Sequence, residues 1–77
     1  MTVLDEFLAH TKKLLENSLS QSDLDPISVL SFRAQVYGLF HDNFDIEKIY
    51  YELLEIFEDR DFNHLVPAIE SYYKTLN

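Results

Sequence analysis

The sequence predicts an all-α protein, a small antiparallel four-helix bundle, and three observations support this prediction. Apolar residues recur at three- and four-residue spacing along most of the chain, which is the period of an amphipathic helix. The 77 residues include one glycine and two prolines, too few for the turns that β-hairpins need. Four periodic segments are joined by short connections, which make successive helices antiparallel neighbours. We expect a single helical domain over residues 1–77.

The first helix is predicted from Thr2 to about Ser20. Thr2 and Asp5 have the spacing of a capping box, with Asp in place of the usual Glu or Gln. The polar residues 20–24 that follow are expected to form a loop. The apolar stripe of this helix consists of Leu4, Phe7, Leu8, Thr11, Leu14, Leu15 and Leu19.

The second helix is predicted from Ile27 to about His41. Asp25 is expected to be its N-cap, and Pro26 occupies the first helical position, where its missing N–H costs nothing. Its apolar residues surround most of the helix, so we expect burial on several sides. Arg33 within it then needs an acidic partner or a route to water. The apolar residues are Ile27, Val29, Leu30, Phe32, Ala34, Val36, Tyr37, Leu39 and Phe40.

The third helix has the clearest period and is expected to end near Asp59-Arg60. Asp45 has the position of an N-cap, and Phe44 and Ile49 have the spacing of a hydrophobic staple around it. Its apolar stripe consists of Ile46, Ile49, Tyr50, Leu53, Ile56 and Phe57.

The fourth helix is expected to be interrupted. Asp61 can cap a first turn through Leu65, but Pro67 removes a backbone donor and clashes with the preceding turn. We therefore predict a short turn and then a kink or restart near Pro67. The stripe after it consists of Ala68, Ile69, Tyr72, Tyr73 and Leu76.

Size and composition limit how the fold is stabilised and where it resides. A chain of this length buries only about 60% of its unfolded surface, and without cysteine it has neither disulfides nor thiolate metal ligands. Regular helix packing or self-association must therefore stabilise it. No apolar run approaches the roughly 20 residues of a membrane span, and residues 1–6 lack the basic region of a secretory signal. We expect a soluble, cytoplasmic protein.

The charge points to basic partners. Fourteen acidic and six basic residues give a net charge of −8, which repels nucleic acid and anionic membranes. A basic protein, such as a nuclease or another nucleic-acid-binding protein, is the complementary partner. The alternative is that the charge serves solubility alone.

The negative charge is concentrated between Asp42 and Asp61, where eight acidic residues accompany two basic ones. On the third helix several of these acids share the side opposite the apolar stripe. Tyr51 lies in the middle of that row, and tyrosine is enriched in binding hot spots. The alternative is that Tyr51 packs on a neighbouring helix above a merely solvated acidic face. The candidate partner-binding residues are Asp45, Glu47, Tyr51, Glu52, Glu55, Glu58 and Asp59.

The sequence gives no catalytic, metal or cofactor site, so we expect no enzyme. His10, His41 and His64 have no partner at metal-ligand spacing, and there is no Glu-x-x-His pair of the kind that di-metal bundles use. A glycine-rich phosphate loop and a serine nucleophile motif are also absent. The segment Ser22-Asp23-Leu24 differs in order from the Asp-Ser-Leu motif of acyl carrier proteins.

Two hypotheses of function follow. The small acidic immunity proteins that neutralise bacterial nuclease toxins also present tyrosines among acids, and Ile49-Tyr50-Tyr51 resembles them in this respect, although the surrounding residues do not follow their pattern. The analogy is one of surface chemistry and not of family, and it implies a stoichiometric inhibitor whose carboxylates imitate phosphates, without turnover. The alternative is a structural or adaptor subunit that forms a homodimer through apolar helix faces.

Overall fold

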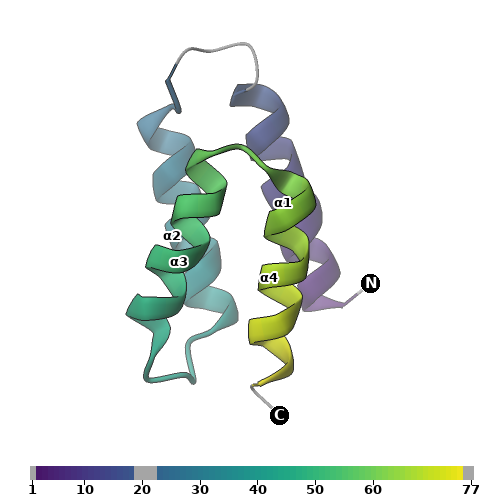
Figure 1. The fold of residues 1–77 in the computed structure, drawn as a ribbon, viewed down its shortest axis with the longest axis vertical. Helices are drawn as coiled ribbons and strands as arrows, with labels where there is room; N and C mark the ends of the chain where they lie inside the picture. The colour runs from purple at the N-terminus through teal and green to yellow at the C-terminus, as the bar shows by residue number, and fades with distance from the viewer. Residues whose placement is uncertain (1, 19–22, 76–77) are drawn as a thin grey trace.

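The computed structural model describes residues 2–18 and 23–75, and these form four helices. The helices are α1 (Val3–Ser18), α2 (Pro26–Leu39), α3 (Ile46–Glu58) and α4 (Phe62–Lys74). They run alternately up and down, and the start of α1 lies at the same end of the bundle as the end of α4 (Figure 1). Contacts join α1 to α2, α2 to α3, α3 to α4 and α1 to α4, which closes the bundle. The predicted antiparallel four-helix bundle is confirmed.

Helix α1 begins with the predicted capping box. The Asp5 N–H donates to Thr2 Oγ1 at 3.1 Å, and the Thr2 N–H donates to Asp5 Oδ2 at 3.3 Å. Phe7, Thr11 and Leu15 of the predicted stripe are buried. Leu19 of that stripe and residues 20–22 of the predicted loop lie outside the described residues.

Helix α2 is also capped as predicted, but it is not buried on several sides. Asp25 Oδ1 accepts from the Ile27 N–H at 3.0 Å, and Pro26 is the first helical residue. One side of α2 packs into the bundle, whereas Ile27 and Leu30 remain 73% and 65% exposed. The expectation was wrong because α2 sits at a corner of the bundle, where two neighbouring helices cover only part of its surface.

The start of α3 differs from the prediction. Asp45 makes no side-chain capping bond. Instead Asn43 Oδ1 accepts from the Asp45 N–H at 2.8 Å, and the Asn43 carbonyl accepts from the Ile46 N–H at 3.2 Å. This turn around Asn43 leaves Phe44 96% exposed, so the predicted staple between Phe44 and Ile49 is absent. An asparagine two residues upstream offers the turn a better acceptor than the expected cap.

The connection from α3 to α4 is a tight helix ending followed at once by a new cap. The Arg60 N–H donates to the Phe57 carbonyl and the Asp61 N–H to the Ile56 carbonyl, which is the Schellman pattern. Arg60 accordingly adopts a left-handed backbone conformation with φ of 58°. The Asp61 side chain then accepts from the His64 N–H at 3.3 Å and caps α4.

Helix α4 is continuous through Pro67, so of the predicted kink or restart the restart is absent. Pro67 is the sixth residue of the helix, so its missing N–H leaves only the Asn63 carbonyl without its helical partner. Both residues are exposed, and water can satisfy that carbonyl. Of the stripe beyond Pro67, Ile69 is buried, and Leu76 lies outside the described residues.

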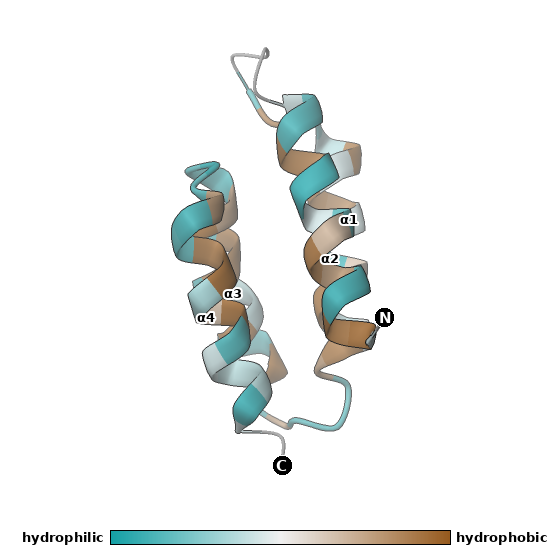
Figure 2. Ribbon diagram, turned by 90° about the vertical axis from the view of Figure 1, so that its right-hand side faces the viewer, coloured by the Kyte–Doolittle hydropathy of each residue, from teal (hydrophilic) through white to brown (hydrophobic). Residues whose placement is uncertain are grey.

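The core is organised around Phe32 of α2, which is fully buried. Its ring stacks on Phe57 of α3 with a centroid distance of 4.2 Å and an interplanar angle of 9°. The ring of Phe7 of α1 lies 6.3 Å away on another side. The apolar surfaces of α3 and α4 turn toward the layer formed by α1 and α2 (Figure 2). Among the described residues, no helix is both long and apolar enough to cross a membrane.

Thr11 of α1 is an exception within this core. It is fully buried, and its hydroxyl has no hydrogen-bond partner. A buried polar group without a partner loses its hydration and receives nothing in exchange. Thr11 therefore lowers the stability of the core that surrounds it.

We expect Thr11→Val to raise the free energy of unfolding by about 1 kcal/mol, because valine has a similar shape and no hydroxyl to desolvate. Thr11→Ser is the matched control: it keeps the hydroxyl, loses a methyl group and should lower stability by about 1 kcal/mol. Urea denaturation followed by circular dichroism measures both. A valine variant less stable than the wild type would show that the hydroxyl is bonded in solution.

We expect Asn43→Ala to cost about 1 kcal/mol of stability, because it removes the acceptor that starts α3. Asp45→Ala should cost only a few tenths of a kcal/mol, through the weaker attraction between its carboxylate and the helix dipole. Phe44→Ser should leave stability nearly unchanged, because the ring is already exposed. Thermal unfolding of the three variants ranks them, and a larger loss for Asp45→Ala would restore the cap predicted from the sequence.

Candidate protein-binding surface

The outer side of α3 carries the candidate binding residues. Ile49, Tyr50, Leu53 and Phe57 are buried on the opposite side of this helix. The structure places every predicted site residue on the exposed surface, and we call this set the acidic face. It consists of Asp45, Glu47, Tyr51, Glu52, Glu55, Glu58 and Asp59. At about 1.5 Å per residue, it extends over roughly 20 Å.

The carboxylates of the acidic face are oriented toward solvent. Among the described residues, the side chains of His41 and His64 lie within 4 Å of the carboxylates of Asp42 and Asp61, respectively. Both pairs lie beyond the ends of α3, and neither involves a carboxylate of the acidic face. Lys48 is a basic residue on the same side of the helix, and it is exposed as well. The acidic face is therefore strongly negative.

Tyr51 projects from the centre of this surface. It is 62% exposed, and its ring contacts the ring of Tyr50, with a centroid distance of 5.3 Å. Tyr51 is therefore not packed on a neighbouring helix, which was the alternative. An exposed ring supported from behind by a buried one loses little conformational freedom when a partner covers it.

Behind Tyr51 lies a cluster of rings that the sequence reasoning missed. The guanidinium of Arg33 lies over the rings of Tyr37 and Tyr50, at 5.1 and 5.4 Å from their centroids. Tyr37 and Tyr50 are themselves 5.6 Å apart. Arg33 is exposed to water, which is one of the two arrangements that the sequence analysis expected for it. Its charge is also attracted to two aromatic faces. The four-residue spacing of Arg33 and Tyr37 was the available signal.

Tyr50 links this cluster to the core. Its ring lies 6.4 Å from Phe32, and the residue is 3% exposed. Burial raises the pKa of the Tyr50 phenol above its ordinary value, and the nearby positive charge of Arg33 opposes this shift. The neutral phenol is therefore the form that the folded protein favours.

Phe44 is a second exposed ring that the sequence reasoning assigned wrongly. It is 96% exposed, and it lies between Asp42 and Asp45 in the connection before α3. An exposed aromatic side chain of this size is typical of contact surfaces. Its position between two aspartates in a short loop was the signal that favoured exposure over a staple.

The histidines have local roles. His10 Nε2 lies 3.2 Å from Ser31 Oγ and links α1 to α2. His41 Nδ1 lies 2.9 Å from the Gly38 carbonyl at the end of α2. His64 contacts Asp61 in the first turn of α4. Within residues 2–18 and 23–75, no group of three His, Asp or Glu side chains is placed to hold a metal ion.

The arrangement offers carboxylates and exposed rings on a convex helix surface. Such a surface suits contact with a complementary macromolecule better than enclosure of a small molecule, which needs a concave site. Comparisons of the chain with protein-family models, with curated proteins and with solved structures found no match.

We expect Tyr50 to make the protein less stable in alkali. The phenol has an ordinary pKa of about 10 in the unfolded chain and a higher pKa in the fold. The stabilisation is therefore fully present below pH about 10, and it is lost as the pH rises through the higher folded value. Tyr50→Phe should lose less stability than the wild type between pH 9 and 11, measured by urea denaturation at each pH. Parallel losses in the two proteins would exclude Tyr50 as the source.

Proposed function

We propose that the protein is a non-catalytic binding module, a stoichiometric inhibitor or regulator that docks its acidic face on a basic protein. The partner class is a nuclease or another nucleic-acid-binding protein, whose basic surface normally receives phosphates. The carboxylates of α3 occupy the place of those phosphates. Occlusion of the partner's surface is the whole mechanism, and no bond is made or broken.

The observation that carries this proposal is the exposure of Tyr51 within the acidic face. The ring is 62% exposed, so most of its surface is available to a partner and little of it serves the core. Aromatic residues at the centre of a contact provide much of its binding energy, while charges at the rim guide the encounter. Tyr51 and the surrounding carboxylates supply these two parts.

Phe44 supports the same proposal from the end of the helix. It precedes Asp45, the first residue of the acidic face, and lies seven residues before Tyr51. Two exposed rings, one in the connection before α3 and one within α3, can enter two separate recesses of a partner. Two anchors fix the orientation of a bound helix, which a single anchor does not.

Charge and apolar contact contribute differently to such a complex. Long-range attraction between an acidic and a basic surface accelerates association, and salt screens it. The rings act only at contact and slow dissociation. The proposed complex therefore forms more slowly at high salt, while the effect of removing Tyr51 persists at any salt concentration.

We expect Tyr51→Ala/Glu55→Lys to abolish capture of the partner while changing the melting temperature by only a few degrees, because both side chains are exposed. The measurement is affinity capture from nuclease-treated lysate of the source organism, read by mass spectrometry at low and high salt. Basic proteins retained at low salt by the wild type and lost by the variant are the expected result.

The control variant is Glu70→Lys on α4, which makes the same change of charge as Glu55→Lys at an exposed position outside the acidic face. It should capture the same proteins as the wild type. Equal loss in both variants would show that only net charge matters. Unfolding of the double variant would show that this side of α3 contributes to the core, and the docking proposal would fail.

A further inference from the structure

Part of the exposed surface of α2 is apolar, and it includes no residue of the acidic face. Ile27, Leu30, Ala34 and Gly38 follow one another at intervals of three or four residues, so they form one stripe along the helix. We call them the α2 stripe. All four are exposed, and none is charged. Buried positions such as Phe32 and Val36 occupy the other side of the same helix.

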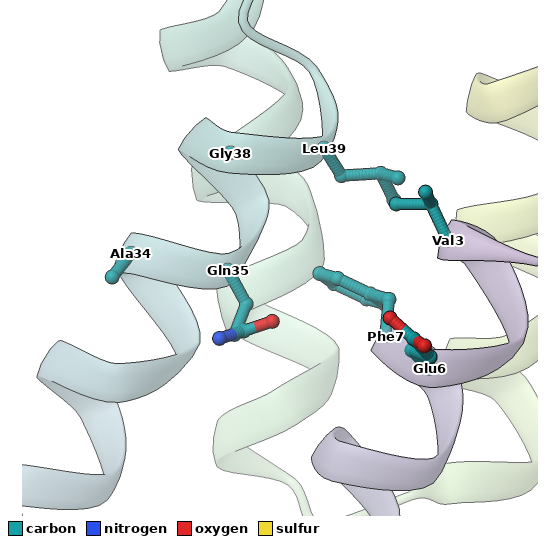
Figure 3. A pocket seen from close by; sticks show the side chains of 7 residues that line it. All are labelled: Val3, Glu6, Phe7, Ala34, Gln35, Gly38 and Leu39. Carbon is teal, nitrogen blue, oxygen red and sulfur yellow. The ribbon is translucent and has the colours of Figure 1, made fainter.

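The stripe ends in a hollow between α1 and α2. The hollow has a volume of about 240 Å³, and Val3, Phe7, Ala34, Gly38 and Leu39 provide most of its lining. Val3 and Leu39 extend toward one another across its rim, and the ring of Phe7 points toward α2 (Figure 3). Apart from its own helix backbone and chain neighbours, nothing lies within 4 Å of the position that a Cβ on Gly38 would take.

Large and small residues are separated along the stripe. Ile27 and Leu30 project from its first half, and Ala34 and Gly38 leave space in its second half. When two such helices pack antiparallel about a two-fold axis, each large residue faces a small one. Ile27 of one copy then lies over Gly38 of the other, and Leu30 lies near Ala34.

We propose that the α2 stripe and the adjoining edge of α1 form an isologous antiparallel interface with a second copy of this chain. The hollow beside Gly38 receives Ile27 of the second copy. Two-fold symmetry fills both hollows at once, and it covers Val3 and Leu30, which are each 65% exposed in the single chain.

Charge complementarity on α1 selects a second copy as the occupant. Glu6 lines the hollow, and Lys13 lies seven residues later, two turns along the same side of α1. Both side chains are exposed. In an antiparallel pair, Glu6 of each copy faces Lys13 of the other, which gives two symmetric ion pairs at the rim.

One two-fold axis satisfies both relations. The midpoint between Glu6 and Lys13 falls at residues 9–10, and the midpoint between Ile27 and Gly38 falls at residues 32–33. The contact of His10 with Ser31 at 3.2 Å and the contact of Phe7 with Phe32 place these two midpoints at the same height in the bundle. The shape relation on α2 and the charge relation on α1 therefore share a centre.

The size of the surface sets the expected affinity. Fourteen helical residues span about 21 Å, and two helices packed roughly 9 Å apart give a patch about 20 Å wide. Such a patch buries on the order of 1,000 Å² over both copies, the lower limit for a specific complex. We therefore expect a reversible dimer with a dissociation constant of roughly 10–100 µM. The interface uses no residue of the acidic face and does not depend on the function proposed for it.

Sedimentation equilibrium of the purified protein from about 1 µM to 1 mM tests the interface. The wild type should show a monomer–dimer equilibrium in this range. Glu6→Lys and Lys13→Glu should each weaken it about tenfold, because each replaces two attractive pairs with two repulsive ones. The double variant Glu6→Lys/Lys13→Glu keeps the native net charge and should restore the wild-type constant.

Lys48→Glu on α3 is the control for charge, because it alters the net charge as Lys13→Glu does but lies outside the interface. It should dimerise within about twofold of the wild type, since distant exposed charges are largely screened in physiological salt. A wild type that stays monomeric at 1 mM would overturn the proposal. A double variant that dimerises as weakly as the single variants would overturn it too, because the antiparallel pairing predicts that the double variant regains the wild-type dissociation constant.

Gly38→Leu separates the interface from the fold. Leucine favours helix over glycine, and the Cβ that it adds meets no atom within 4 Å in the single chain, so the melting temperature of dilute protein should rise. The same side chain fills the hollow that Ile27 of the second copy needs, so dimerisation should fall at least tenfold. Undiminished dimerisation of this variant would overturn the proposed pairing.

Discussion

The stack of Phe32 on Phe57 is the contact on which the rest of the structure depends. It joins α2 to α3 at a centroid distance of 4.2 Å, and the Phe7 ring of α1 packs against the same phenylalanine. A chain of 77 residues without a disulfide has few such contacts to share among four helices. Because Phe32 faces inward, the side of α2 opposite to it faces solvent, and that is where the α2 stripe lies.

The same ring cluster connects the core to the acidic face. Phe32 contacts Tyr50, Tyr50 contacts Tyr51, and Arg33 covers Tyr50 from the solvent side. From Phe32 through Tyr50 to Tyr51, the residues become progressively more exposed to solvent. Tyr51 is thereby supported by buried rings of the core, although its own ring is exposed. The acidic face therefore lies on a helix that packs on the core, as the proposed docking requires.

Features set by local chemistry were predictable from the sequence. The capping box of Thr2 and Asp5, the cap at Asp25 and the period of α3 depend on residues within one or two turns, and all of them are present. The exposure of the acidic face followed from that period. Competition between neighbours was harder to predict: Asn43 supplies the turn that Asp45 was expected to cap, and Phe44 is exposed as a result. The burial of α2 was misjudged because composition does not reveal how many neighbours a helix acquires.

Pro67 shows that the effect of a proline on a helix depends on where in the helix it lies. Proline in a helix costs a hydrogen bond and a steric clash, but the cost depends on which carbonyl loses its partner. In α4 that carbonyl belongs to exposed Asn63 near the helix start, and the helix persists. The contact of Arg33 with Tyr37 was indicated by their four-residue spacing, whereas its contact with Tyr50 could not be predicted, because Tyr50 belongs to another helix.

The left-handed backbone at Arg60 restricts how this chain can vary through evolution. Among the described residues it is the one position with positive φ. Glycine and asparagine adopt that conformation at low cost, whereas β-branched residues fit it worst. Backbone geometry therefore restricts which substitutions position 60 tolerates, independently of any selection on the surface residues nearby. Divergent descendants of this chain should keep Gly, Asn or an unbranched side chain two residues after the last residue of α3, even where the acidic residues around it have been replaced.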